Sequence, residues 1–179
     1  MSKNSSMPRV TLVLGGARSG KSVYGENLIG GCESPVYLAT AEAGHGDDQD
    51  GEMAARIAEH QKRRGPRWQT VEEPLDLAGA LSAHAHLPVL VDCLTLWLAN
   101  IMAADLDVKG ELDTLDGCLK ELAGPVILVS NEVGQGIVPD NALGRAYMDN
   151  AGRMNQRIAT CAGRVVVIHA GLPQMLKDE

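Results

Sequence analysis

The chain has 179 residues, of which 45% are hydrophobic, and its formal net charge at pH 7 is −7. We expect this length to form one domain over residues 1–179, with residues 1–8 flexible. The acidic balance argues against a nucleic-acid-binding protein, which needs a broad positive surface, and the longest apolar run, residues 94–104, is too short to cross a bilayer.

The first element predicted is a buried strand at residues 10–14, which are β-branched or otherwise apolar apart from a threonine. It leads into Gly-Gly-Ala-Arg-Ser-Gly-Lys-Ser at residues 15–22, which matches the phosphate-binding P-loop pattern without a mismatch. A helix is predicted for residues 21–29. In such a loop backbone N–H groups surround phosphate oxygens, Lys21 adds a positive charge and the Ser22 hydroxyl holds Mg²⁺. The sequence therefore predicts binding of a nucleoside triphosphate.

The rest of the chain alternates between strand and helix patterns. Strands are predicted at residues 36–40, 68–72, 88–93, 125–130 and 164–169, the last being the final strand. Helices are predicted at residues 52–64, 75–86, 94–104, 111–123 and 141–162, and a polar loop at 43–51. This order is typical of an α/β fold with a mostly parallel central sheet flanked by helices, as in P-loop nucleotide hydrolases.

Ligands of such sheets bind at the carboxyl ends of the strands. The strand at residues 88–93 contains Asp92 after an apolar run, which is the pattern of a Walker B carboxylate that reaches Mg²⁺. Thr40 and Glu42 follow the second strand, and Asn131 with Glu132 follows the fifth. We expect these strand ends to converge on the P-loop.

Two further candidates each have two interpretations. His60 lies on the apolar face of the predicted helix at residues 52–64, which favours a packed histidine, but neutral imidazole is also a nucleophile toward phosphorus. The cations beside it either stabilise phosphate charge or form a solvated helix end. Glu72 either ends a strand or accepts hydrogen bonds from a ribose or base.

The four cysteines, at positions 32, 93, 118 and 161, are scattered and form no C-x-x-C pair. This spacing indicates neither a zinc site nor a disulfide framework. Reduced thiols are typical of cytoplasmic proteins, and we expect this location.

Several phrases together resemble the bifunctional adenosylcobinamide kinase and adenosylcobinamide-phosphate guanylyltransferase family of cobalamin assembly. They are the P-loop at 15–22, Tyr-Leu-Ala-Thr-Ala at 37–41, Glu-Met-Ala-Ala-Arg-Ile at 52–57, His60 followed by Arg64 and Trp68, Asp-Cys-Leu-Thr-Leu-Trp at 92–97, Asn-Glu-Val-Gly-Gln-Gly-Ile-Val-Pro at 131–139, and Asn155 with Gln156. The resemblance spans nearly all of residues 10–177 and implies a RecA-like P-loop domain that assembles as a homotrimer.

The resemblance also implies the site residues. His60 corresponds to the histidine that becomes guanylylated, with Lys21 and Asp92 as the other catalytic residues and with Ser22 and Asp92 at the metal. The implied nucleotide contacts are Gly16, Ala17, Arg18, Ser19, Gly20, Lys21, Ser22, Val23, Thr40, Ala41, Glu42, Gln61, Lys62, Arg63, Arg64, Glu72 and Asp92.

The implied reaction has two steps. The hydroxyl of adenosylcobinamide first takes the γ-phosphoryl group of ATP or GTP with Mg²⁺, and His60 then passes GMP from a second GTP to adenosylcobinamide phosphate. Because His60 must be neutral to attack, guanylylation is expected to fail below about pH 6.5. Two alternatives stay open: a small-molecule kinase of the same fold in which His60 is structural, and a RecA-like ATPase module acting on a partner or on DNA.

Overall fold

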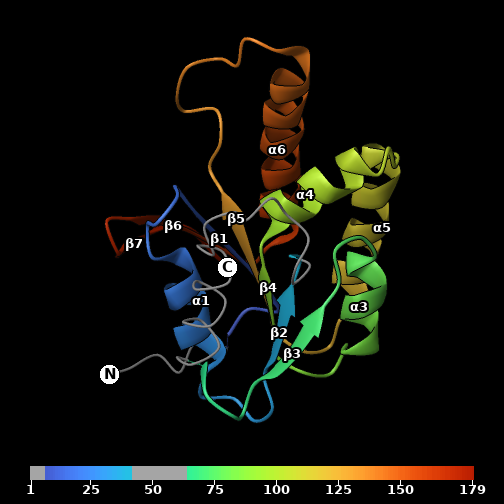
Figure 1. The fold of residues 1–179 in the computed structure, drawn as a ribbon. Coiled ribbons are helices and arrows are strands. Elements are labelled where there is room, and N and C mark those ends of the chain that lie inside the picture. The colour runs from blue at the N-terminus through green and yellow to red at the C-terminus, as the bar shows by residue number, and fades with distance from the viewer. Residues whose placement is uncertain (1–6, 42–63) are drawn as a thin grey trace.

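The computed structural model describes residues 7–41 and 64–179. One sheet contains all its strands, in the order β3-β2-β4-β5-β1-β6-β7 (Figure 1). The strands are β1 (Val10–Gly15), β2 (Val36–Ala39), β3 (Gln69–Glu72), β4 (Val89–Asp92), β5 (Val126–Asn131), β6 (Arg164–His169) and β7 (Leu172–Asp178). The helices are α1 (Lys21–Ile29), α3 (Leu77–Ala83), α4 (Leu94–Ala103), α5 (Val108–Glu121) and α6 (Ala142–Cys161).

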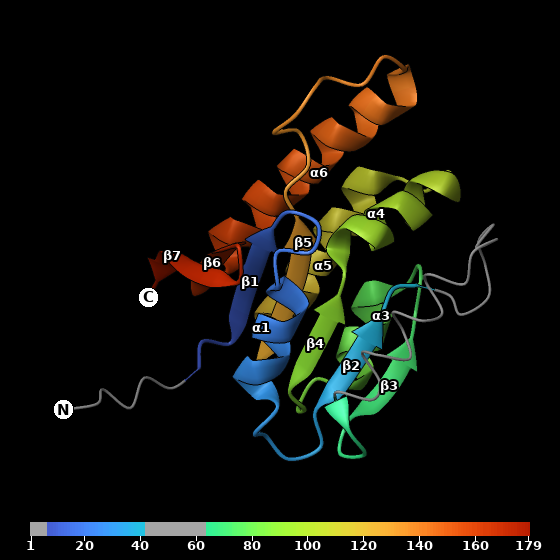
Figure 2. The same ribbon diagram turned by 60° about the vertical axis from the view of Figure 1, so that its left-hand side comes forward.

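The sheet separates two layers of helices. Strands β1 to β6 run parallel to one another, and β7 pairs antiparallel with β6. Helix α1 lies on one face, whereas α3, α4, α5 and α6 lie on the other (Figures 1 and 2). Burial on both faces is why the central strands are almost continuously apolar. The predicted α/β fold with a mostly parallel sheet is confirmed.

Alternating side chains of the strands fill two separate apolar cores. Leu12 and Leu128 belong to the core under the four-helix layer, whereas Val13 and Val129 belong to the smaller core under α1. The chain has no phenylalanine, and Trp97 is a large aromatic side chain of the larger core, where it is 1% exposed. Its indole N–H donates to the Leu75 carbonyl at 2.8 Å. Because side chains alternate between the two faces of a strand, only every second residue can face α1, the helix that follows the P-loop.

Most predicted elements agree with the structure within one residue, and three differ from it. Helix α3 is shorter than residues 75–86, because the Asp76 carboxylate caps it by accepting from Gly79 N–H and the helix ends at His84. Helix α5 begins three residues before the predicted residue 111, because Asp107 caps it. The strand at 164–169 is not the last, since β7 follows it and pairs with it.

Other sequence predictions lie outside the described residues. They include the flexibility of residues 1–6, the polar loop at 43–51 and the helix at 52–64 except for Arg64. Within the described ranges no helix combines the length and apolar character needed to cross a membrane.

Candidate active site

The P-loop connects β1 to α1 and encloses its own lysine. A Cβ on Gly15 would lie 2.7 Å from the Ile168 carbonyl oxygen, and Gly20 has a φ of 98°, so both positions favour glycine. The Ser19 N–H donates to the Gly16 carbonyl at 3.3 Å, which closes the turn before the helix. The backbone geometry agrees with a phosphate-binding loop at a helix N-terminus.

Lys21 is the charged group within this loop. Its side chain is only 8% exposed, and Nζ donates to the Gly16 carbonyl at 2.9 Å. Burial lowers the pKa of Lys21, while the nearby Asp92 carboxylate and the Cys93 thiol act in the opposite direction. The loop thus holds a desolvated cation close to a carboxylate, and a phosphate group would supply the counter-charge that burial makes favourable.

Asp92 ends strand β4 and faces the same side of the sheet as α1. One of its oxygens, Oδ2, accepts a hydrogen bond from the Tyr37 hydroxyl at 3.0 Å. The P-loop strand β1 and the Asp92 strand β4 are separated by β5 alone. The structure therefore brings together Lys21 and Asp92, two of the three residues predicted to be catalytic.

A magnesium ion would have oxygen donors at this place. Ser22 is half-buried in the first turn of α1, and Asp92 contributes a carboxylate. The described residues contain no cluster of three or more His, Cys, Asp or Glu side chains that could hold a metal. The oxygens of Ser22 and Asp92 fit Mg²⁺, which is usually bound by one or two protein oxygens together with substrate phosphates and water.

The predicted nucleotide contacts lie on several parts of the fold. Residues 16–23 lie together in the P-loop and the first turn of α1. Thr40 and Ala41 follow β2, and Glu72 ends the edge strand β3, where it is exposed. Four strand spacings separate β1 from β3, which is about 19 Å along the sheet. A nucleotide bound at the P-loop would have to cross the ends of three strands to reach Glu72.

Thr40 is fully buried and its hydroxyl already has protein partners. Oγ1 donates to the Cys93 carbonyl at 2.9 Å and accepts from the Cys93 N–H at 3.0 Å. The Asn100 side-chain amide donates to the Thr40 carbonyl at 2.7 Å. These bonds fasten the end of β2 to the residue after Asp92, so the observed role of the hydroxyl is to position these strand ends.

Arg64 is the one residue of the predicted contacts at 61–64 that the structure describes. Its guanidinium carbon lies 3.2 Å from the centre of the Tyr37 ring, and its Nη1 atom is buried without a hydrogen-bond partner among the described residues. His60, Glu42, Gln61, Lys62 and Arg63 lie outside the described residues. Their predicted roles remain predictions.

A polar cluster joins the carboxyl ends of β4 and β5. The Asn131 side-chain amide donates to Thr95 Oγ1 at 2.6 Å, and Thr95 Oγ1 lies 3.2 Å from the Cys93 thiol. The Tyr147 hydroxyl on α6 donates to the Thr95 carbonyl at 2.9 Å. Burial, reinforced by Asp92, raises the pKa of Cys93, which keeps this thiol protonated at neutral pH. The predicted convergence of Asn131 with the Asp92 strand end is therefore observed.

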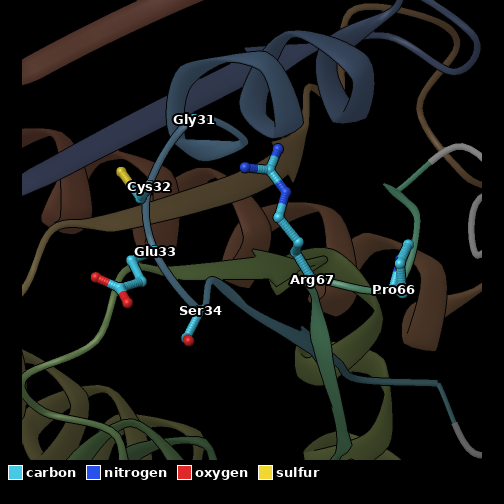
Figure 3. Close-up of a pocket in the computed structure, with 6 residues that line it drawn as sticks. All are labelled: Gly31, Cys32, Glu33, Ser34, Pro66 and Arg67. Atoms are coloured by element: carbon cyan, nitrogen blue, oxygen red, sulfur yellow. The ribbon is translucent and has the colours of Figure 1, made fainter.

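A surface pocket of about 440 Å³ lies at the opposite end of the sheet (Figure 3). It is lined by residues 31–34 between α1 and β2 and by Pro66 and Arg67, which precede β3. Arg67 donates to the Gly30 carbonyl at 2.9 Å. Because ligands of parallel sheets bind at the carboxyl ends of strands, this pocket is separate from the candidate active site.

Comparison with known proteins now adds to this geometry. The sequence pattern of the cobinamide kinase / cobinamide phosphate guanyltransferase family matches residues 11–176. The chain belongs to this family. It is 50% identical to the bifunctional adenosylcobalamin biosynthesis protein CobP of Pseudomonas aeruginosa, over 94% of this chain and 97% of that protein. It is 35% identical to the bifunctional adenosylcobalamin biosynthesis protein CobU of Escherichia coli, over 93% of this chain and 98% of that one.

The fold is also similar to that of a P-loop enzyme outside the cobinamide kinase family. An ATPase from the type III secretion system of pathogenic bacteria superimposes with a TM-score of 0.60 at 13% identity, covering 94% of this chain and 57% of the ATPase. At this identity the likeness concerns the fold alone. It supports the P-loop fold class expected from the sequence.

Tyr37 is the site residue of this cobinamide kinase family member that sequence reasoning missed. In the sequence it belongs to the phrase at residues 37–41, which by itself indicates no role for the tyrosine. Its position offered one signal: it stands two residues before the end of β2, so strand alternation places it on the α1 face together with Asp92. The contact itself joins residues 55 positions apart and has no local pattern.

Proposed function

We propose that this chain is a bifunctional enzyme of cobalamin biosynthesis, which phosphorylates adenosylcobinamide and then transfers GMP to adenosylcobinamide phosphate. The observation that carries the proposal is the buried Lys21 of the P-loop beside Asp92, in a chain whose family match covers residues 11–176. Its relatives in Pseudomonas aeruginosa and Escherichia coli are bifunctional proteins of adenosylcobalamin biosynthesis.

In the kinase step the hydroxyl oxygen of the aminopropanol arm attacks the γ-phosphorus of ATP or GTP, and the nucleoside diphosphate leaves. Lys21 and the N–H groups of the P-loop stabilise the charge on the phosphoryl oxygens. Ser22 and Asp92 would hold Mg²⁺, which neutralises charge on the β- and γ-phosphates when it is bound. Alternatively, Asp92 would orient the attacking hydroxyl.

In the transferase step an imidazole nitrogen of His60 attacks the α-phosphorus of GTP, and pyrophosphate leaves. The GMP is then bound to the ring through a P–N bond. A phosphate oxygen of adenosylcobinamide phosphate attacks the same phosphorus, which breaks the P–N bond, frees His60 and gives adenosylcobinamide-GDP. Covalent catalysis divides one difficult transfer into two easier ones.

The proposal also covers the oligomeric state, the cellular location and the kind of substrate. A homotrimer follows from the family resemblance. A cytoplasmic location agrees with the four cysteines, which form no disulfide. The net charge of −7 supports small-molecule substrates and argues against a nucleic-acid partner.

The test is incubation with Mg²⁺ and GTP labelled at the α-phosphorus, followed by denaturing electrophoresis. We expect acid-labile, base-stable label on the wild-type protein and on His86→Ala, an exposed histidine that serves as the control, but none on His60→Ala. A labelled His60→Ala protein would refute the assignment of the nucleophile. An unlabelled wild-type protein that still phosphorylates cobinamide would show the plain kinase instead.

A further inference from the structure

Tyr37 contacts Asp92 in the candidate active site, and the proposed reaction gives it no role. Strand register places it opposite Leu90, two residues below the pair formed by Ala39 and Asp92. The side chain lies on the α1 face and is 8% exposed. From there its hydroxyl reaches Asp92 Oδ2 at 3.0 Å. One oxygen of the carboxylate is thereby fixed by a donor on a neighbouring strand.

The ring of the same tyrosine holds a cation. The guanidinium carbon of Arg64 lies 3.2 Å from the ring centre, which is within cation–π range, and the edge of Trp68 meets the ring at a centroid distance of 6.4 Å and an angle of 74°. Arg64 Nη1 is buried and donates to no described residue. In sequence Arg64 stands four residues after His60. The Tyr37 ring therefore holds Arg64, one of the predicted nucleotide contacts.

We propose that Tyr37 is a positioning residue that serves both chemical steps through two different parts of its side chain. Its hydroxyl orients Asp92 for the kinase step, and its ring face orients Arg64 for the transferase step, with the unpartnered guanidinium N–H directed to a phosphate of the nucleotide. This inference rests on the proposed function, which assigns Asp92 and Arg64 to the nucleotide site.

The group that accepts the hydrogen bond of its hydroxyl distinguishes Tyr37 from a tyrosine with a purely structural role. The acceptor of its hydroxyl is the Walker B carboxylate, a charged group, and not a backbone carbonyl of the kind that Tyr147 uses. The Tyr37 hydroxyl donates to this carboxylate at 3.0 Å from the neighbouring strand β2. A donor on one carboxylate oxygen leaves the other oxygen to a metal-bound water or the substrate hydroxyl.

Two substitutions separate the two parts of the side chain. Tyr37→Phe removes the hydroxyl and keeps the ring. The kinase kcat should fall about tenfold, because a metal-binding carboxylate loses a hydrogen-bond donor that orients it. The rate of guanylylation should stay within about threefold of the wild-type rate. Tyr37→Leu removes both, so both rates should fall. Arg64→Ala should lower the guanylylation rate, because it removes the guanidinium that lies on the Tyr37 ring.

Binding provides a second readout that does not depend on turnover. In a titration of a fluorescent GTP analogue at several Mg²⁺ concentrations, Tyr37→Phe should raise the half-saturating Mg²⁺ concentration about tenfold, and the shift should vanish in an Asp92→Asn background. Tyr24→Phe is the matched control, because Tyr24 packs against the same core from α1. Urea unfolding of each variant verifies that the fold is retained.

The outcomes are distinguishable. Wild-type protein that accepts no GMP would refute the proposed transferase function itself. Wild-type protein with both activities, together with Tyr37→Phe that keeps normal Mg²⁺ dependence and kinase kcat, would overturn the role of the hydroxyl. Equal loss of both activities in Tyr37→Phe would overturn the division of roles, as would an Arg64→Ala variant with normal guanylylation.

Discussion

Asn155→Ala is expected to destabilise the protein, although the residue lies on helix α6 away from the P-loop. The Ser130 hydroxyl, which is 0% exposed, donates to Asn155 Oδ1 at 2.6 Å. In turn Asn155 Nδ2 donates to the Asn131 carbonyl at 3.1 Å. Alanine leaves the buried hydroxyl unpartnered, at a cost of about 1–3 kcal/mol, and removes the second bond, worth about 0.5–1.5 kcal/mol. The free energy of unfolding should fall by about 2–4 kcal/mol.

A double-mutant cycle with Ser130→Ala isolates the interaction. Ser130→Ala alone should cost about 1 kcal/mol, because Asn155 is half-buried and water can replace the lost donor. With the hydroxyl gone, Asn155→Ala has one less group to leave unpartnered, so the coupling energy should be about 1–2 kcal/mol. Urea unfolding of the four proteins measures it, with the exposed neighbour Gln156→Ala as the control. Additive costs, or an Asn155→Ala variant as stable as the wild type, would refute the reasoning.

Two predictions concern ionisation at the site. The affinity for GTP should be highest at neutral pH and should fall as the pH rises through the lowered pKa of Lys21, because only the ammonium form attracts phosphate. At such a pH, binding of GTP should be accompanied by uptake of protons. Calorimetry in two buffers measures both effects, and finding neither would contradict the prediction. The Cys93 thiol, whose pKa burial raises, should react with iodoacetamide several times more slowly in the folded protein than in urea, as measured by mass spectrometry of its peptide, and equal rates would contradict the assigned burial.

Local chemistry was sufficient to predict the P-loop, Asp92 and most of the elements. The residues of β1, β4 and β5 are apolar because both faces of a parallel sheet are covered, and this leaves a signal in any window of the sequence. The P-loop likewise needs glycines and a lysine at fixed spacing, because its backbone must close around phosphate. Such features depend on neighbours in the chain, and the sequence displays them directly.

Strand β7 shows where local patterns fail. Its residues, which include Pro173, are mostly exposed and carry no burial pattern, so they resemble a loop. They form a strand because β6 offers a free edge for hydrogen bonding, and the Arg164 guanidinium pairs with Asp178 across the two strands at 2.8 Å. The helix prediction at 75–86 was too long for a related reason, since the Asp76 cap and the ending at His84 are set by particular hydrogen bonds.

The assembly of the site depends on contacts between distant residues. No local pattern states that β5 lies between the P-loop strand and the Asp92 strand, that Thr40 fastens β2 to Cys93, or that Tyr37 connects Asp92 to Arg64. These relations arise when strands far apart in the chain pair in one register and turn their side chains to the same face. Amino-acid types at short spacing fix the chemistry that the chain carries, whereas the packing of the folded chain fixes which of those groups can act on the same substrate.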